Sequence, residues 1–116
     1  MDAEEIRIGA DFGCGPYGWR KSAGGSSWSN FACVGSGLSE EIGTSQELDA
    51  DFAEWVISFE QNYDAPDFDW SSFHFQGIAL ATLLKTEVGD RFIIYYCTPS
   101  EDPIRGNNPP MLIESP

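Results

Sequence analysis

Two segments with the periodicity of an α-helix follow each other between residues 44 and 89 of this chain. Apolar residues of the first segment recur at intervals of three and four, which places their side chains on one helix face. These residues are Leu48, Phe52, Trp55, Val56, Phe59 and Tyr63. The stretch Thr44-Ser45-Gln46-Glu47 fits a capping box, in which the Thr44 hydroxyl and the Glu47 carboxylate satisfy each other's backbone N–H groups. We therefore predict a helix that begins at Thr44.

The second segment follows Asp64-Ala65-Pro66-Asp67, where the first helix must end because Pro66 cannot continue it. Asp69 or Ser71 can cap a second helix, and Gly89 stands where a left-handed C-terminal cap is wanted. The expected apolar face consists of Phe73, Gly77, Leu80, Ala81, Leu84 and Val88. Because the connection is short, we expect the two helices to pack antiparallel.

Strand patterns lie on both sides of the predicted helix pair. Ile6, Ile8, Ala10 and Phe12 alternate with more polar or smaller residues, as in a half-buried strand. Residues 17–22 and 27–34 are expected to form two further strands joined by a Gly- and Ser-rich turn. Residues 92–97 are apolar on both faces, which suits a central strand covered by the helices.

These elements predict one domain of the α+β class over residues 1–98, which agrees with a chain of 116 residues. We expect an N-terminal strand or hairpin region, the antiparallel helix pair on one face of a small sheet, and the last strand beside the first. Residues 99–116 are rich in Pro and Asn and are expected to form an irregular tail, in which Met111-Leu112-Ile113 could dock back.

The cysteines, the N-terminal residues and the length of the apolar stretches indicate the cellular compartment. Cys14, Cys33 and Cys97 are odd in number and show no Cys-x-x-Cys spacing, so they predict neither a disulfide framework nor a zinc site. The acidic start of the chain is unlike a secretory signal, and no apolar stretch approaches the ~20 residues that a membrane span needs. We expect a soluble, cytoplasmic protein.

Charge is the most unusual part of the composition. Six Lys and Arg residues stand against 19 Asp and Glu residues, which gives a net charge of −13. Such a chain repels nucleic acid phosphates and anionic membrane surfaces, and it attracts basic partners. Direct binding to nucleic acid or to a membrane surface is therefore not expected.

The acids are also concentrated along the chain. No Lys or Arg occurs between Lys21 and Lys85, an interval that holds ten acids. The simpler interpretation is that the helix dipole favours the acids of the first helical turn and that the other acids keep the protein soluble. Later acids are left uncompensated, and like charges three or four residues apart on a helix repel each other. A cationic partner is the better account, and its predicted contacts are Glu47, Asp51, Glu54, Asp64, Asp67 and Asp69.

Other candidate chemistry is weaker. The acidic loop 64–69 lacks the spacing of a calcium-binding loop, and we expect the single histidine, His74, to cap or flank the first turn of the second helix. Gly13-Cys14-Gly15 is only part of a dinucleotide fingerprint, so we interpret its glycines as turn formers. Cys33 and Cys97 are expected to be core thiols. We therefore expect no enzyme activity, catalytic residue, cofactor or metal, with Cys14 as the alternative centre of a small enzyme or ligand-binding domain.

Several short segments occur in a recognisable order over residues 6–98. They are Ala10-Asp11-Phe12-Gly13-Cys14-Gly15-Pro16-Tyr17-Gly18-Trp19, Leu38-Ser39-Glu40-Glu41, Trp55 with Phe59-Glu60 and Tyr63, Phe68-Asp69-Trp70, and Gly77-Ile78-Ala79-Leu80-Ala81. In this order the chain resembles a group of short acidic bacterial proteins. Some of that group are immunity proteins encoded beside polymorphic or contact-dependent growth-inhibition toxins.

The resemblance and the charge together lead to one hypothesis for function. It is an immunity protein that binds a cognate basic toxin domain, with a nuclease as the expected class, and blocks its active or substrate-binding surface. We expect a monomer that forms a 1:1 complex. The alternatives are a nucleic-acid mimic that inhibits a defence protein, and the small enzyme or ligand-binding domain that would use Cys14.

Overall fold

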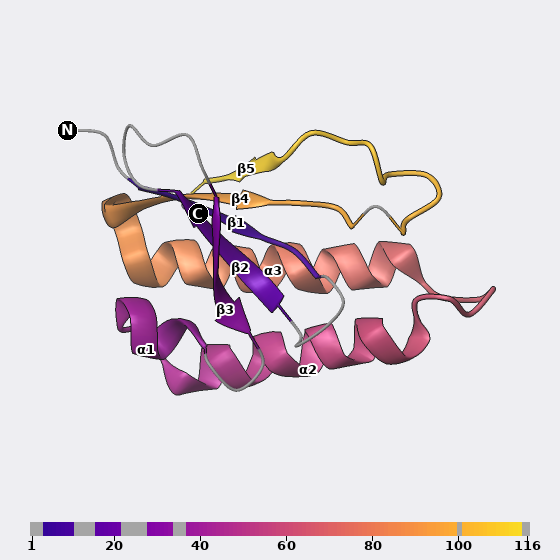
Figure 1. The fold of residues 1–116 in the computed structure, drawn as a ribbon, viewed down its shortest axis with the longest axis horizontal. Helices are drawn as coiled ribbons and strands as arrows, with labels where there is room; N and C mark the ends of the chain where they lie inside the picture. The colour runs from indigo at the N-terminus through magenta and orange to yellow at the C-terminus, as the bar shows by residue number, and fades with distance from the viewer. Residues whose placement is uncertain (1–3, 11–15, 22–27, 34–36, 100, 115–116) are drawn as a thin grey trace.

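A five-stranded mixed sheet with strand order β3-β2-β1-β4-β5 forms one layer of the computed structural model, which describes residues 4–10, 16–21, 28–33, 37–99 and 101–114. The strands are β1 Glu4–Ile8, β2 Pro16–Lys21, β3 Ser29–Cys33, β4 Phe92–Tyr96 and β5 Met111–Ile113. Two long helices lie along one face of this sheet (Figure 1). The predicted α+β class is confirmed.

The strand pairings explain which residues enter the core. β1 and β4 are parallel neighbours, with Ile6 opposite Ile94, whereas the other neighbouring strands are antiparallel. Ile6, Ile8 and Ile94 are fully buried, while the alternate residues of β1 and β4 are only partly buried. The predicted hairpin of β2 with β3 and the predicted position of the last strand beside the first are confirmed. The turn over 22–27 and Phe12 lie outside the described residues.

The helices are α1 Leu38–Ile42, α2 Gln46–Asn62 and α3 Trp70–Val88, followed by the short 3₁₀ helix η1 Gly89–Arg91. α2 and α3 run side by side in opposite directions beneath the sheet, as predicted (Figure 1). The predicted apolar faces are buried, apart from Tyr63 and Leu80, which are partly exposed. The Asp69 carboxylate accepts a hydrogen bond from Ser72 N at 3.0 Å, so Asp69 is the cap of α3.

The start of α2 differs from the predicted capping box. Ser45 is the N-cap, and its Oγ accepts a hydrogen bond from Leu48 N at 3.3 Å. Ser45 N and Oγ in turn donate to the carboxylate of Glu87 at 2.7 and 2.9 Å. The expectation of Thr44 paired with Glu47 is therefore wrong, because a carboxylate from the end of α3 replaces the local one.

Glycine at position 77 allows α3 to pack closely on its neighbours. A Cβ atom there would lie 2.5 Å from Trp55 Cζ2 and 2.6 Å from Tyr96 Cε1. The Trp55 ring stacks on Phe73 with 4.7 Å between centroids, and its Nε1 donates to Phe73 O at 3.0 Å. Trp55 thus joins α2 to α3 from within the core and is only 4% exposed.

α1 and β5 have no counterpart among the predicted helices and strands. α1 is a five-residue helix whose start is held by Asp49 of α2, since both carboxylate oxygens accept from Ser39 N at 3.2 and 3.1 Å. β5 pairs with β4 and buries Ile113, so Met111–Ile113 of the segment set apart as a tail belongs to the sheet. None of the helices in the described residues has the length and apolar character needed to cross a bilayer.

Candidate protein-binding groove

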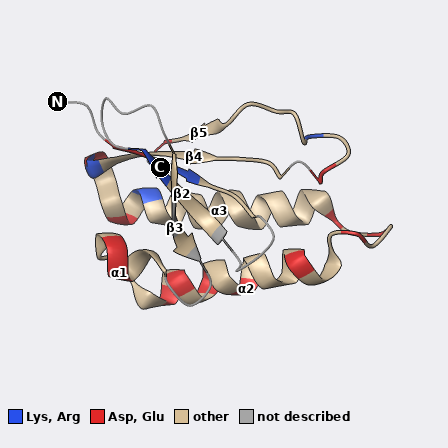
Figure 2. Ribbon diagram, in the orientation of Figure 1, with Lys and Arg blue, Asp and Glu red and all other residues tan. Residues whose placement is uncertain are grey.

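The acidic side chains of α1, α2 and the turn to α3 lie in a part of the chain without Lys or Arg. Figure 2 shows Asp and Glu along these segments, whereas on the sheet, toward the end of α3 and in the loop before β5 basic and acidic residues occur together. The basic residues also have local partners: Arg20 pairs with Glu4 at 2.5 Å and Lys21 with Glu5 at 3.1 Å. α2 itself carries no Lys or Arg.

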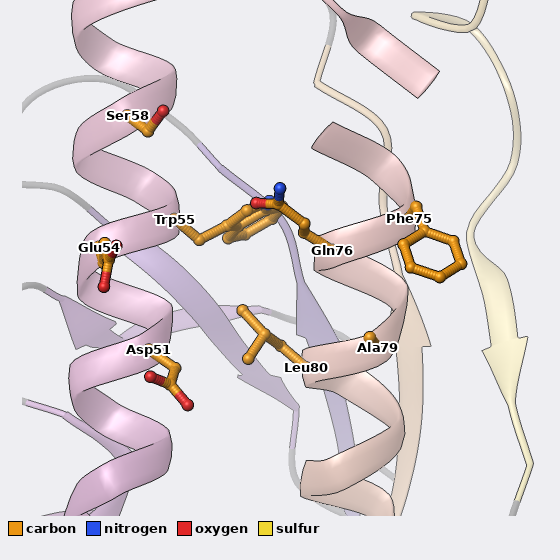
Figure 3. Close-up of a pocket in the computed structure, with 8 residues that line it drawn as sticks. All are labelled: Asp51, Glu54, Trp55, Ser58, Phe75, Gln76, Ala79 and Leu80. Atoms are coloured by element: carbon orange, nitrogen blue, oxygen red, sulfur yellow. The ribbon is translucent and has the colours of Figure 1, made fainter. Parts of the chain in front are cut away.

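A groove of about 490 Å³ lies between α2 and α3. α2 contributes Asp51, Glu54, Trp55 and Ser58, and α3 contributes Phe75, Gln76, Ala79 and Leu80. In Figure 3 the strands of the sheet lie behind the two helices, with Trp55, Gln76 and Leu80 between them. The groove therefore opens on the side of the helix pair that faces away from the sheet, with an apolar floor and an acidic wall.

The groove continues toward the turn that joins the helices. A second hollow of about 170 Å³ shares Trp55, Ser58 and Gln76 with the first. It extends to Asp69 at the start of α3. Asp51, Glu54 and Asp69 consequently border one continuous furrow, with carboxylates near both of its ends.

The six predicted contact residues divide into two sets. Asp51, Glu54 and Asp69 border the furrow, whereas Glu47, Asp64 and Asp67 lie outside its lining. All six are exposed, and no ion pair involves any of them within the described residues. The structure thus brings three of the predicted residues to one surface feature.

Sequence reasoning missed the apolar part of this site. Trp55 and Leu80 were assigned to the core, and the structure shows that both also form the floor of the groove. Phe75 was not assigned at all, although its side chain is 76% exposed and projects from α3 on the side away from α2 (Figure 3). A large aromatic residue outside the apolar periodicity of α3 is the signal that could have found it.

His74 takes part in a buried network that the sequence did not predict. It is buried within α3, where Nε2 lies 2.7 Å from Asp102 Oδ2 and Nδ1 lies 2.7 Å from the Tyr96 hydroxyl. His74 thus follows the first turn of α3, as one of the two expectations had it, but it is not the cap; it is buried because the loop that contains Asp102 folds back over α3. Ionised Asp102 only accepts hydrogen bonds, so Nε2 carries the proton and, in neutral His74, Nδ1 accepts from the Tyr96 hydroxyl.

The titration of this buried network favours a structural role. Burial acts to raise the pKa of Asp102, but hydrogen bonds from His74 and from the N–H groups of Arg105 and Ile104 lower it to about 2. Burial raises the pKa of Tyr96 well above its usual range, which makes the phenol a poor nucleophile. The network therefore ties the loop before β5 to α3 and β4.

The cysteines give no support to a catalytic site in the described residues. Burial raises the pKa of the Cys97 thiol, the opposite of the change that activates a nucleophile. Cys14 lies outside the described residues. Across the described ranges, no three His, Cys, Asp or Glu side chains gather where they could hold a metal ion.

Comparisons with protein-family models, with curated proteins and with solved structures gave no match. The chemistry of the groove is therefore the basis for assigning a function. This surface is concave and has an apolar floor, an exposed aromatic ring and carboxylates that form no ion pair with any residue the structure describes, which are features of a protein-binding site.

Proposed function

We propose that this protein is an inhibitor of the immunity type, which binds a basic toxin domain through the α2–α3 face in a 1:1 complex in the cytoplasm. The observation that supports this proposal most directly is which charges are paired within the chain. The acids of α2 and of the α2–α3 turn form no ion pair within the described residues, while Arg20, Lys21 and Arg105 have acidic partners elsewhere.

Solubility alone accounts for exposed carboxylates, but it does not account for the apolar groups beside them. Phe75 exposes a large aromatic surface next to a groove floored by Trp55 and Leu80. Exposed apolar patches rimmed by polar residues are typical of interaction sites, and aromatic residues dominate the binding energy of many interfaces. The combination favours a protein partner over simple hydration.

A basic nuclease is the class of toxin domain that this surface would fit best. Such an enzyme holds substrate phosphates with Lys and Arg side chains, and the same cations can pair with carboxylates. Occupation of that surface would exclude the substrate. Complementary charge also speeds association ten- to a thousandfold at low ionic strength, which suits an inhibitor that must act before its toxin does.

The test begins with the neighbouring reading frame. We expect it to encode a long protein with a basic C-terminal domain that is toxic when expressed alone and harmless when expressed with this chain. Calorimetry should show a 1:1 complex whose affinity falls between low salt and ~0.5 M NaCl, because salt screens the attraction. A neighbouring frame without a basic domain, or a domain that forms no complex, would overturn the proposal.

A further inference from the structure

We infer that the α2–α3 groove receives a cationic amphipathic helix of the partner. In this arrangement the apolar face of the helix lies on Trp55 and Leu80, and its Lys or Arg side chains pair with Asp51 and Glu54. The inference rests on the proposed function and specifies which part of this surface is used and which structural element fits it.

The shape of the groove favours a helix. Two antiparallel helices leave a furrow between them that runs parallel to their axes. A third helix can pack into such a furrow, with its side-chain ridges in the grooves of the other two helices. The lining runs from Asp69 to Leu80 along α3, which at 1.5 Å per residue is about 16 Å, or three helical turns. An extended strand would gain little here, because the N–H and C=O groups of α2 and α3 are paired within their own helices.

The charge of the groove selects a cationic occupant. Asp51 and Glu54 are one turn apart on the same wall, and among the residues that the structure describes no Lys or Arg lines either hollow. A helix that desolvated these carboxylates without bringing positive charge would leave them buried and unpaired, which is costly. Lys or Arg side chains on the flank of an apolar helix face remove that cost.

Phe75 indicates that the partner extends beyond this one helix. Phe75 lines the edge of the groove, but its ring points away from α2, so a helix seated between α2 and α3 would leave much of the ring uncovered (Figure 3). Ala79 and Leu80 continue the apolar surface along α3. A partner that seats a helix in the groove and rests a neighbouring surface against Phe75 would cover both features.

The first experiment uses a defined probe with the full chain. The probe is a synthetic helix of about four turns with Leu on one face and Lys on its flanks, compared with the same peptide carrying Glu in place of Lys. We expect the Lys peptide to shift the NMR signals of the Trp55 indole N–H and the Gln76 side-chain amide, and the Glu peptide not to bind. Shifts that map to other residues would overturn the inference.

Matched variants separate the groove from general charge. D51N/E54Q and E47Q/D67N each remove two negative charges from exposed positions, but only the first pair lines the groove. We expect D51N/E54Q to weaken binding of the Lys peptide about tenfold or more, and E47Q/D67N to weaken it less than about threefold. Equal losses in the two variants would overturn the inference.

The two proposals can fail separately. If the neighbouring basic domain binds and both double variants weaken its binding equally, the immunity function stands and the groove is not its site. If the Lys peptide binds in the groove but the neighbouring domain forms no complex, the groove chemistry stands and the immunity function is wrong.

Discussion

Asp102 and Asp51 show two opposite uses of a carboxylate in this protein. Asp102 is 2% exposed and accepts hydrogen bonds from His74, from Ile104 N and from Arg105 N. Asp51 is exposed on α2 and takes part in no ion pair within the described residues. The first carboxylate is saturated by the fold, and the second is left facing solvent at the edge of a groove.

The difference separates stability from binding. Removing a saturated, buried carboxylate leaves its donors unpaired, so the free energy of unfolding should fall. Removing an exposed carboxylate without partners should leave stability almost unchanged and reduce only the affinity for a cationic partner. Each of the following changes tests one side of this contrast.

The largest effect is expected for D102A. The Asp102 side chain is fully buried, and its loss would strand His74 and two backbone N–H groups. We expect the free energy of unfolding, measured by urea denaturation, to fall by about 3–5 kcal/mol. D51A, measured in parallel, should change it by less than about 0.5 kcal/mol. Similar losses of unfolding free energy in D102A and D51A would show that the two carboxylates do not differ in their contribution to stability.

Acid should act through the same buried carboxylate. The pKa of Asp102 is lowered from its ordinary 3.8 to about 2 in the fold. Its contribution to stability is therefore complete above pH 3.8 and is lost as the pH falls through 2; it amounts to about 2 kcal/mol. D102N should lack this part of the pH dependence. If the free energy of unfolding of D102N and of the wild type fell in the same way with falling pH, this part of the pH dependence would not come from Asp102.

Phe75 offers a test on the binding side. F75S removes a ring that is 76% exposed, and L83S removes a comparable exposed apolar side chain of α3 outside the groove lining. We expect F75S to weaken the complex with the neighbouring basic domain about tenfold, or about 1.4 kcal/mol, and L83S to have little effect. Circular dichroism should show the same melting temperature for F75S and wild type. Unchanged affinity for F75S would exclude its ring from the interface.

Asp49 and Asp51 give a comparison within one helix. The Asp49 carboxylate accepts hydrogen bonds from Ser39 N and from the Ser39 hydroxyl, and so holds the start of α1. We expect D49A to lower the free energy of unfolding by about 1 kcal/mol, the typical cost of losing a helix cap. Binding of the Lys peptide should not change. If D49A weakened binding of the peptide more than D51A, Asp49 and not Asp51 would contact the peptide, and the proposed groove would be wrong.

The parts of this structure that the sequence predicted depend on residues close together in the chain. The faces of α2 and α3, the two cap candidates of α3, of which Asp69 is the one used, and the presence of strands β1 to β4 all follow from spacings of a few residues. The missed features join distant residues: Ser45 bonds Glu87, and His74 bonds Asp102. Acidic contact residues could be named from charge alone. The groove floor could not, because a residue such as Trp55 serves the core and the surface together.

The smallest expected effect concerns the stability of D51N/E54Q. Glu47, Asp51 and Glu54 are spaced by four and three residues on α2, so their like charges destabilise the helix by a few tenths of a kcal/mol per pair. Neutralising two of them should leave the free energy of unfolding unchanged or raise it by a few tenths of a kcal/mol. At high salt the difference should vanish, because screening already removes the repulsion. A loss of about 1 kcal/mol or more would mean that these carboxylates support the fold as Asp102 does, and the reason to assign them to a partner would disappear.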